Sequence, residues 1–268
     1  MPPETIIRSR HNPIYKQIRS LLRRDRRHEE RAFLVEGPRF IADAQRFGAK
    51  PQMLVLSETF ASSLDLPENA FHVARILDDE LFSTVSDTVA SQGMLGVFAF
   101  PDLTPDPAVE PFLVIADGIQ DPGNLGTLIR SAAGAGATQV ITLPGTVDPW
   151  SPKTVRAAAA AHFIIPVEAM PFDVLARSLP KDLSVVGADA AGSARYDEVD
   201  MSGPLALMVG GEGAGLSTNA RELANQLVSI PLAGEVESLN AGVAGSILLF
   251  EASRQRRQSG KFVENTNV

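Results

Sequence analysis

The feature that most constrains the fold is a regular alternation of short apolar strands with helices in the second half of the chain. The expected strands are residues 112–116, 139–142, 164–167, 185–188, 205–209 and 227–230, and the expected helices are residues 125–135, 152–161, 172–179, 219–224 and 239–254. Strands that are apolar along their whole length are typical of a parallel sheet that is covered by helices on both faces. The alternation therefore predicts an α/β domain built on a parallel sheet.

The first hundred residues predict a separate and smaller α/β unit. Its expected strands are residues 33–35, 53–56, 71–73 and 96–100, and its expected helices are residues 14–24, 39–47 and 78–84. The stretch that follows, PDLTPDPAVEP at residues 101–111, has four prolines among polar residues and is typical of a semi-rigid linker. We therefore expect two domains, residues 1–104 and residues 105–268.

The composition argues against several classes of protein. The chain has no cysteine, which excludes disulfides and thiolate metal sites and fits a reducing cytoplasm. It has no apolar run of about 18 residues, and its first residues, MPPETIIRSRHNP, contain no apolar signal core, so we expect no membrane span and no secretion signal. Its four histidines are scattered, so we expect no metal cluster.

Positive charge is concentrated at the N-terminus of an otherwise acidic chain. Residues 1–31 carry a formal charge of +5 and the remainder −13, which gives the total of −8. A basic arm on an acidic body is typical of phosphate binding, and a solvated helix face explains the same charges equally well. The candidate phosphate contacts are Arg8, Arg10, Arg23, Arg24, Arg26 and Arg27.

Two loops after expected strands carry unusual polar residues, and in open α/β sheets ligands bind beyond the carboxyl ends of the strands. The loop DGIQDPGNLGTLIR opens a helix near Asn124 and places Arg130 on it. The alternatives are that Asn124 is only an N-cap and Arg130 only a surface residue. The loop VGGEGAGLS, which contains Glu212, lacks both the lysine of phosphate-binding loops and the dinucleotide fingerprint. We therefore expect neither ATP nor GTP hydrolysis.

A third stretch, IPLAGEVESLNAGVAGSILLFE at residues 230–251, follows the last expected strand. Polar Ser238 and Asn240 stand where a helix begins, and free backbone N–H groups there suit a polar ligand. The small residues after them let another backbone approach closely. The alternative is that Ser238 is only an N-cap and that the small residues serve helix packing.

In order and spacing, these three stretches resemble the motifs of the SpoU/TrmH family of RNA ribose 2′-O-methyltransferases, within the SPOUT superfamily. The residues that match the three motifs are Asn124, Gly126 and Arg130; Gly210, Glu212 and Gly215; and Ile230, Pro231, Gly234, Ser238, Leu239 and Asn240. The pattern from Arg8 through FLVEGPRFIADA resembles a small ribosomal-protein-like substrate domain. The chain departs from the family where Ala241-Gly242 replaces Val-Ser, and where five alanines follow Arg156.

The resemblance implies a trefoil-knotted catalytic domain that binds S-adenosylmethionine and pairs into a homodimer. It implies that Gly210, Ile230 and Leu239 contact the cofactor. It further implies that Asn124, Glu212, Ser238 and Asn240 position the reacting groups, and that Arg130 activates the hydroxyl, either as a base or only by orienting it.

The same resemblance implies an RNA substrate that is met by the basic arm, with ribosomal RNA preferred and transfer RNA as the alternative. Two rival functions are a non-catalytic RNA-binding module of the same fold and an ordinary nucleotide-binding α/β enzyme. The intact motif residues argue against the first rival, and the missing lysine argues against the second.

Overall fold

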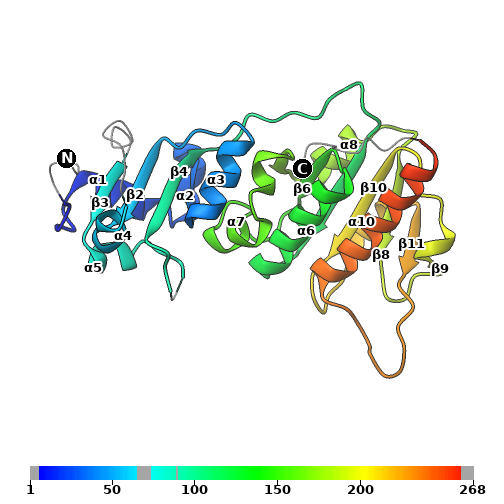
Figure 1. The fold of residues 1–268 in the computed structure, drawn as a ribbon. Coiled ribbons are helices and arrows are strands. Elements are labelled where there is room, and N and C mark those ends of the chain that lie inside the picture. The colour runs from blue at the N-terminus through cyan, green and yellow to red at the C-terminus, as the bar shows by residue number, and fades with distance from the viewer. Residues whose placement is uncertain (1–5, 65–73, 89, 261–268) are drawn as a thin grey trace. The chain divides into compact units, whose positions relative to one another are not determined.

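The computed structural model describes residues 6–64, 74–88 and 90–260, and it divides into two compact units (Figure 1). The first unit consists of residues 1–102 and 150–163, and the second of residues 103–149 and 164–268. The break at 102 lies close to the expected boundary after residue 104. The segment 150–163, which was expected in the second domain, packs in the first unit instead. In the described residues, no helix is long and apolar enough to cross a bilayer.

The first unit contains a mixed four-stranded sheet in the order β1-β4-β2-β3. Its strands are β1 (Ala32–Glu36), β2 (Met53–Ser57), β3 (Ala74–Leu77) and β4 (Met94–Ala99), and its helices in residues 1–102 are α1 (Pro13–Ser20), α2 (Arg24–Glu30), α3 (Pro38–Arg46), α4 (Glu58–Ser62) and α5 (Asp79–Ser83). Strands β2 and β3 are parallel, and the other pairs are antiparallel. The strand expected at residues 71–73 lies outside the described residues.

The basic helix expected at residues 14–24 ends early, and a second helix, α2, begins at Arg24. Helix α1 ends at Ser20, and Arg23 has an extended backbone before α2 begins. The turn buries Leu21 in the core of the sheet together with Tyr15 and Ile18 of α1. The apolar residues of this segment are thus buried by a bend rather than by one straight amphipathic helix.

The opposite face of this sheet is covered by the segment 150–163 through aromatic side chains. The ring of Trp150 stacks on Phe100 with centroids 4.2 Å apart and lies 5.0 Å from Phe33, while Phe163 lies 5.2 Å from Phe98. Helix α7 (Pro152–Ala158) is shorter than the helix expected at 152–161, because the two residues after it have left-handed backbones, with φ of 47° and 67°.

The second unit confirms the predicted parallel sheet. Seven strands lie in the order β7-β6-β5-β10-β8-β11-β9, and every neighbouring pair is parallel. The strands are β5 (Phe112–Asp117), β6 (Gln139–Thr142), β7 (Val167–Ala169), β8 (Ser184–Ala188), β9 (Ala194–Arg195), β10 (Leu205–Gly210) and β11 (Gln226–Ser229). The helices are α6 (Pro122–Ala135), α8 (Phe172–Ser178), α9 (Thr218–Leu223) and α10 (Ala241–Gln258). The short β9 was not expected from the sequence.

Helices α6 and α10 lie side by side on one face of this sheet, as Figure 1 shows, and small residues bring them together. A Cβ atom added to Gly242 would lie only 2.9 Å from the carbonyl oxygen of Asn124. Further along, the hydroxyls of Ser131 and Ser246 are 2.7 Å apart. This close approach puts the start of α10 next to the start of α6, where the motif residues stand.

Candidate functional site

A cavity of about 600 Å³ opens at the carboxyl ends of β8, β10 and β11 in the second unit. This edge of a parallel sheet is where ligands bind in open α/β folds, and the volume is in the range of small-molecule sites. Six of the predicted site residues line the cavity, namely Gly210, Glu212, Ile230, Ser238, Leu239 and Asn240. The structure therefore brings together residues of the second and third motifs.

The glycines of the second motif are required by the backbone of their own loop. After β10 the chain turns back so that the N–H of Gly215 donates to the carbonyl of Gly211 at 3.0 Å. A Cβ atom on Gly210 would lie 2.1 Å from the carbonyl carbon of Gly215, and one on Gly211 would lie 2.2 Å from the carbonyl oxygen of Gly118. The loop is thus a tight structure that presents Glu212 at its exposed tip.

Three motif side chains from distant parts of the chain are joined by hydrogen bonds. The amide Nδ2 of Asn240 donates to Oδ1 of Asn124 at 2.6 Å, and Nδ2 of Asn124 donates to Oε1 of Glu212. Because the oxygen and the NH₂ group of its side-chain amide are both engaged, the Asn124 side chain has a fixed orientation between Asn240 and Glu212. We refer to Asn124, Glu212 and Asn240 as the polar trio.

The helix caps differ from those that the sequence suggested. The cap of α6 is Asp121, whose Oδ1 accepts from the N–H of Asn124 at 2.9 Å. The cap of α10 is Asn240, whose Oδ1 accepts from the N–H of Val243 at 3.2 Å. The alternatives in which Asn124 and Ser238 are N-caps are therefore wrong. Ser238 lines the cavity.

Arg130 does not join the polar trio. It lies on α6 six residues after Asn124, about 9 Å further along the axis and on a different face of the helix. Its side chain is exposed, and among the described residues it makes no hydrogen bond or ion pair. Within one chain, Arg130 therefore stands apart from the cavity.

Sequence reasoning missed three charged residues that shape the cavity. Buried Asp117 accepts a hydrogen bond from the N–H of Ser217 at 2.6 Å and so holds the far end of the glycine loop. Asp189 and Arg221 form an ion pair in the cavity wall. The sequence could have indicated both aspartates. Asp117 ends the apolar strand β5 and Asp189 directly follows the apolar strand β8, at the edge of the sheet where a ligand binds.

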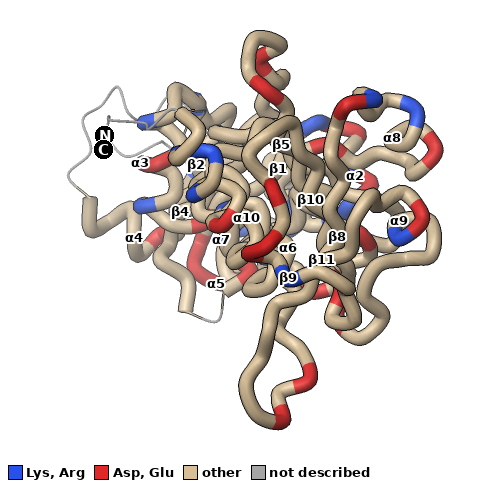
Figure 2. Tube along the Cα trace, turned by 90° about the vertical axis from the view of Figure 1, so that its right-hand side faces the viewer, with Lys and Arg blue, Asp and Glu red and all other residues tan. Residues whose placement is uncertain are grey.

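The charge of the cavity favours a cationic ligand. Its lining includes three carboxylates, from Asp189, Glu212 and Glu237, but only one basic side chain, from Arg221. The loop between β11 and α10, which extends downward in Figure 2 with its acidic positions in red, carries one further carboxylate, that of Glu235. No group of three or more potential metal ligands occurs in the part of the chain that the structure describes.

The basic helices of the first unit form a second candidate surface. A groove there is lined by Arg10, Tyr15, Lys16, Arg19, Ser20, Leu22, Arg23 and Arg26. Of the six predicted phosphate contacts, Arg8, Arg10, Arg23, Arg24 and Arg26 have accessible side chains. Arg27 does not, since it is only 3% exposed and donates to the carbonyl of Leu21 at 2.8 Å. Lys16 and Arg19, which were not predicted, face the groove.

Comparison with known proteins gives a family match for each of the two units. Residues 111–250 match the SpoU rRNA methylase family, and residues 12–96 match the MRM3-like substrate binding domain. The mitochondrial rRNA methyltransferase 3 of Mus musculus is 32% identical, and the alignment covers 86% of this chain and 69% of that protein. The 23S rRNA guanosine 2′-O-methyltransferase RlmP of Bacillus subtilis is 33% identical, with 91% of this chain and 97% of RlmP covered.

Two solved structures that contain AdoMet resemble this one over most of the chain. The AdoMet-bound rRNA methyltransferase from Sinorhizobium meliloti has a TM-score of 0.78 and 34% identity, and covers 93% of this chain and 97% of its own. The SpoU methyltransferase AviRb from Streptomyces viridochromogenes, in complex with AdoMet, has a TM-score of 0.79 and 30% identity, with 92% and 99% covered.

Proposed function

This chain belongs to the SpoU rRNA methylase family and is an S-adenosylmethionine-dependent RNA ribose 2′-O-methyltransferase, and we propose that its substrate is ribosomal RNA. The observation that carries the activity is the polar trio, which is assembled at the rim of a cavity of cofactor size. A non-catalytic RNA-binding module would not need these side chains held together. The names of the relatives favour ribosomal over transfer RNA.

The cavity fits S-adenosylmethionine in size and charge. Its volume of about 600 Å³ accommodates a nucleoside with a short side chain, and its excess of carboxylates suits the cationic cofactor better than a phosphate. Apolar Ile230 and Leu239 offer walls for an adenine ring, and the strand end at Gly210 offers backbone polar groups. We assign cofactor contacts to these three residues.

The chain's own residues supply orientation and charge. When bound, the cofactor supplies a methyl group on a positively charged sulfur, which is already a strong electrophile. The protein must orient a ribose 2′-hydroxyl and assist the loss of its proton. In our proposal, Asn124 and Asn240 hold Glu212 in place, and the Glu212 carboxylate accepts a hydrogen bond from that hydroxyl. Ser238 positions the ribose from the cavity wall.

Arg130 contributes through its positive charge in this proposal. A guanidinium normally keeps its proton at neutral pH, so its ordinary chemistry is to bind a phosphate and stabilise developing negative charge rather than to act as a base. We therefore propose that Arg130 binds the phosphate beside the target ribose and orients the hydroxyl. Its exposed position leaves it accessible to RNA.

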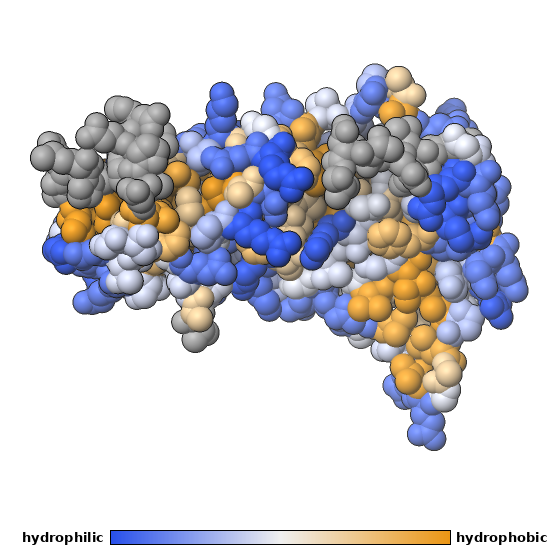
Figure 3. Space-filling model, in the orientation of Figure 1, coloured by the Kyte–Doolittle hydropathy of each residue, from blue (hydrophilic) through white to orange (hydrophobic). Residues whose placement is uncertain are grey.

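The exposed face of α6 and α10 is the surface on which we propose that two copies pair. Val243 and Phe250 on α10 are 46% and 49% exposed, and Val236 in the preceding loop is 56% exposed. Figure 3 shows apolar side chains gathered over this region. An apolar patch of this kind is typical of an interface, and a homodimer would cover it symmetrically. Arg130 lies on α6 beside this patch, so pairing would bring it close to a second chain.

We propose that RNA phosphates bind the groove on α1 and α2 of the first unit. Arg10 and Arg23 have acidic partners at 3.1 and 2.6 Å, and Arg26 pairs with Glu29, but these ion pairs are exposed and exchange easily with phosphates. Lys16 and Arg19 have no acidic partner among the described residues. Arg8, which pairs with Glu58 at 2.7 Å, and Arg24 lie outside the groove lining and would add phosphate contacts, whereas buried Arg27 would add none.

Two further features complete the proposal. The first is the trefoil knot that the family resemblance implies, formed by the chain around the loops that follow β10 and β11. The second is a cytoplasmic location, which the absence of cysteine supports. Neither feature is needed for the assignment of the reaction.

The test of the reaction is a single-turnover transfer of labelled methyl to ribosomal RNA at saturating cofactor, followed by mapping of the modified ribose. Wild type should label one ribose 2′-oxygen. Arg130→Ala should fold and bind cofactor yet lose at least about 100-fold in transfer rate, and Arg130→Lys should recover only part because it lacks the planar fork. Transfer by Arg130→Ala at the wild-type rate would show that Arg130 is an ordinary surface residue.

The test of the RNA groove is the salt dependence of RNA binding. Changing Lys16, Arg19 and Arg23 to alanine together should weaken binding and flatten the slope of log affinity against log salt by about two to three units. Cofactor affinity should stay the same. A matched control is the replacement of Arg46, Arg75 and Lys50, which carry the same charge in the same unit outside the groove. An equal loss of slope in the control would favour non-specific charge over a defined groove.

A further inference from the structure

Arg221 of α9 connects two separate walls of the cavity. One wall is the turn after β8, which contains Asp189, and the other is the end of the glycine loop at Gly215 and Leu216. The Nη1 group of Arg221 pairs with Oδ2 of Asp189, and its Nε donates to the carbonyl of Leu216 at 3.2 Å. Its Nη2 lies against Gly215, only 3.3 Å from where a Cβ atom would stand.

Asp189 is fully engaged within the protein. Its Oδ1 accepts from the N–H of Ala191 at 2.8 Å, and its Oδ2 accepts from Arg221. Only 6% of its side chain is exposed. A carboxylate whose two oxygens are occupied in this way is poorly suited to read the hydroxyls of a ligand, so its contribution must be made through the position of the wall that carries it.

Strands β8 and β10 are paired as far as Gly187 and Met208, and beyond the end of this ladder no other hydrogen bond or ion pair joins the two walls within the described residues. The remaining contact is apolar, between the side chain of Leu216 and the backbone at Gly187, where a Cβ atom would lie 2.7 Å away. Apolar contact resists separation of the walls but is not directional. The ion pair is therefore the directional side-chain contact between the walls beyond the end of the strand ladder.

We propose that the Asp189–Arg221 pair is a positioning pair that sets the width of the cofactor cavity. The inference rests on the proposed placement of the cofactor in this cavity. Because the pair joins the β8 turn to the glycine loop, its loss lets the walls separate and lowers the affinity for the cofactor. Neither residue touches the reacting atoms, so the rate at saturating cofactor depends on the pair much less than the affinity does.

The test is calorimetric binding of S-adenosylhomocysteine to the full-length protein and to four variants. Arg221→Gln and Asp189→Asn should each weaken binding by about 5- to 30-fold, the range that one partly exposed charged hydrogen bond supports. The double variant should bind about as weakly as either single variant, because the two residues act as one unit. Arg221→Lys keeps the ion pair but lacks the Nε donor to Leu216, so its affinity should be intermediate.

A kinetic readout separates positioning from a general loss of structure. For Arg221→Gln, the KM for S-adenosylmethionine should rise in step with the binding defect, while the single-turnover rate at saturating cofactor stays within about threefold of wild type. The matched control is Arg177→Gln, which removes an ion pair with Asp173 on α8, outside the cavity lining. This control should leave both quantities unchanged.

Several results would overturn the proposal. The proposal is wrong if Arg221→Gln unfolds at the wild-type temperature and binds S-adenosylhomocysteine with wild-type affinity. It is also wrong if the losses of affinity in the two single variants add up in the double variant. Ile230→Ala and Leu239→Ala test the cofactor placement separately. If these two weaken binding while Arg221→Gln does not, the placement stands and the positioning pair is wrong. If none of the variants affects binding, the placement itself is wrong.

Discussion

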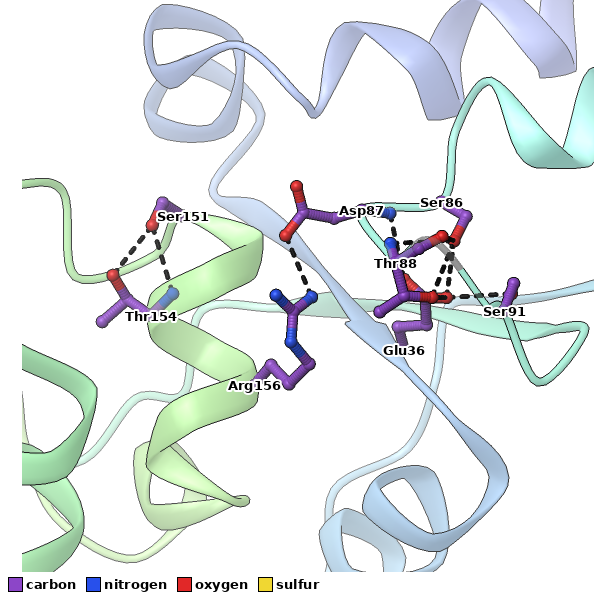
Figure 4. Close-up of polar contacts among 8 residues, drawn as sticks. All are labelled: Glu36, Ser86, Asp87, Thr88, Ser91, Ser151, Thr154 and Arg156. Atoms are coloured by element: carbon purple, nitrogen blue, oxygen red, sulfur yellow. Dashed lines mark hydrogen bonds and ion pairs between the residues drawn. The ribbon is translucent and has the colours of Figure 1, made fainter. Parts of the chain in front are cut away.

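Replacing Glu36 with glutamine should destabilise the first unit, because this carboxylate holds a loop that neutral side chains cannot hold. Figure 4 shows it at the end of β1, surrounded by hydrogen-bond donors. Its Oε1 accepts from the hydroxyls of Ser86, Thr88 and Ser91 at 2.6, 2.6 and 2.9 Å, and its Oε2 accepts from the N–H of Asp87 at 3.1 Å. Burial alone would raise the pKa of Glu36, but these hydrogen bonds outweigh it and hold the pKa below its ordinary value.

The magnitude follows from the donors that glutamine would leave without an acceptor. An amide has one oxygen and one NH₂ group, so in either orientation the NH₂ group of the substituted side chain would face a donor of the loop. An unsatisfied donor costs about 1–3 kcal/mol when buried, and Glu36 is half-buried, so we expect a loss of about 1–2 kcal/mol in the free energy of unfolding. For a unit of roughly a hundred residues this lowers Tm by about 5–10 °C.

The assay is thermal unfolding followed by tryptophan fluorescence. Trp150 is the only tryptophan, and it belongs to the first unit, where it stacks on Phe100 at 4.2 Å. Its emission therefore reports the unit that contains Glu36. The control is Glu80→Gln, which removes only an exposed ion pair with Arg10 and should cost less than about 0.5 kcal/mol. Equal Tm values for wild type and Glu36→Gln would refute the reasoning.

The effect should also depend on pH with a definite sign. Because the pKa of Glu36 is lower in the folded than in the unfolded protein, its stabilisation is complete above the unfolded value and is lost as the pH falls through the folded value. The difference in stability between wild type and Glu36→Gln should therefore be constant near neutral pH and shrink below the ordinary carboxyl pKa of 4.5. A difference that is unchanged down to acid unfolding would mean that the charge of Glu36 contributes nothing.

Three other substitutions test the second unit. Gly242→Leu puts a side chain where a Cβ atom would already lie 2.9 Å from the backbone of Asn124, so it should separate α10 from α6 and cut single-turnover methyl transfer by at least about tenfold. Arg256→Ala removes a buried guanidinium that donates to the carbonyl of Gly203 at 2.6 Å, and it should lower the free energy of unfolding in urea, followed by circular dichroism, by about 2–4 kcal/mol. Phe250→Glu should convert the proposed dimer into monomers in light scattering, whereas a dimer of unchanged mass would place the interface elsewhere.

The parallel sheet and the edge that carries the site follow directly from the sequence. Strands that are apolar throughout have to be buried on both faces, and this requirement leaves few arrangements other than a parallel sheet between helices. Because the carboxyl ends of parallel strands lie at one edge of the sheet, the loops that carry Glu212 and Asn240 are expected to lie together at that edge. The hydrogen bonds that join these residues to Asn124 depend on how closely α6 and α10 pack, which the small residue at Gly242 allows but does not specify.

The roles of individual charges are less predictable, because a sequence pattern does not show which side chains the tertiary structure buries. Arg27 belongs to the same run of basic residues as Arg26, yet a bend after Ser20 turns Arg27 inward to the carbonyl of Leu21. Arg221 lies in an ordinary helical stretch, and only the return of the chain after β8 brings Asp189 to it. In both cases the two residues that interact are separated along the chain by a distance that matches neither helix nor strand periodicity.

The segment 150–163 shows where a domain boundary drawn from sequence fails. The polar linker at residues 101–111 marks a true end of the first sheet, but one face of that sheet is covered by a helix that the chain supplies some fifty residues later. This helix contacts β1, and the aromatic residues on either side of it, Trp150 and Phe163, pack on Phe33. The first unit is therefore continuous in space but not in sequence.

A fragment of residues 1–104 should consequently be an incomplete domain. Without the segment 150–163, the rings of Phe33 and Phe98 lose the partners that bury them, at a cost of at least about 3 kcal/mol, which is a large part of the stability of a small domain. The fragment should bind an apolar dye and unfold with little cooperativity. Joining residues 150–163 to it through a flexible Gly/Ser linker should restore a sharp transition, whereas the same fusion with Trp150→Ala and Phe163→Ala should not. Cooperative unfolding of the bare fragment, at the temperature where Trp150 reports unfolding in the full-length protein, would show that the aromatic segment is dispensable and that the linker alone defines the domain.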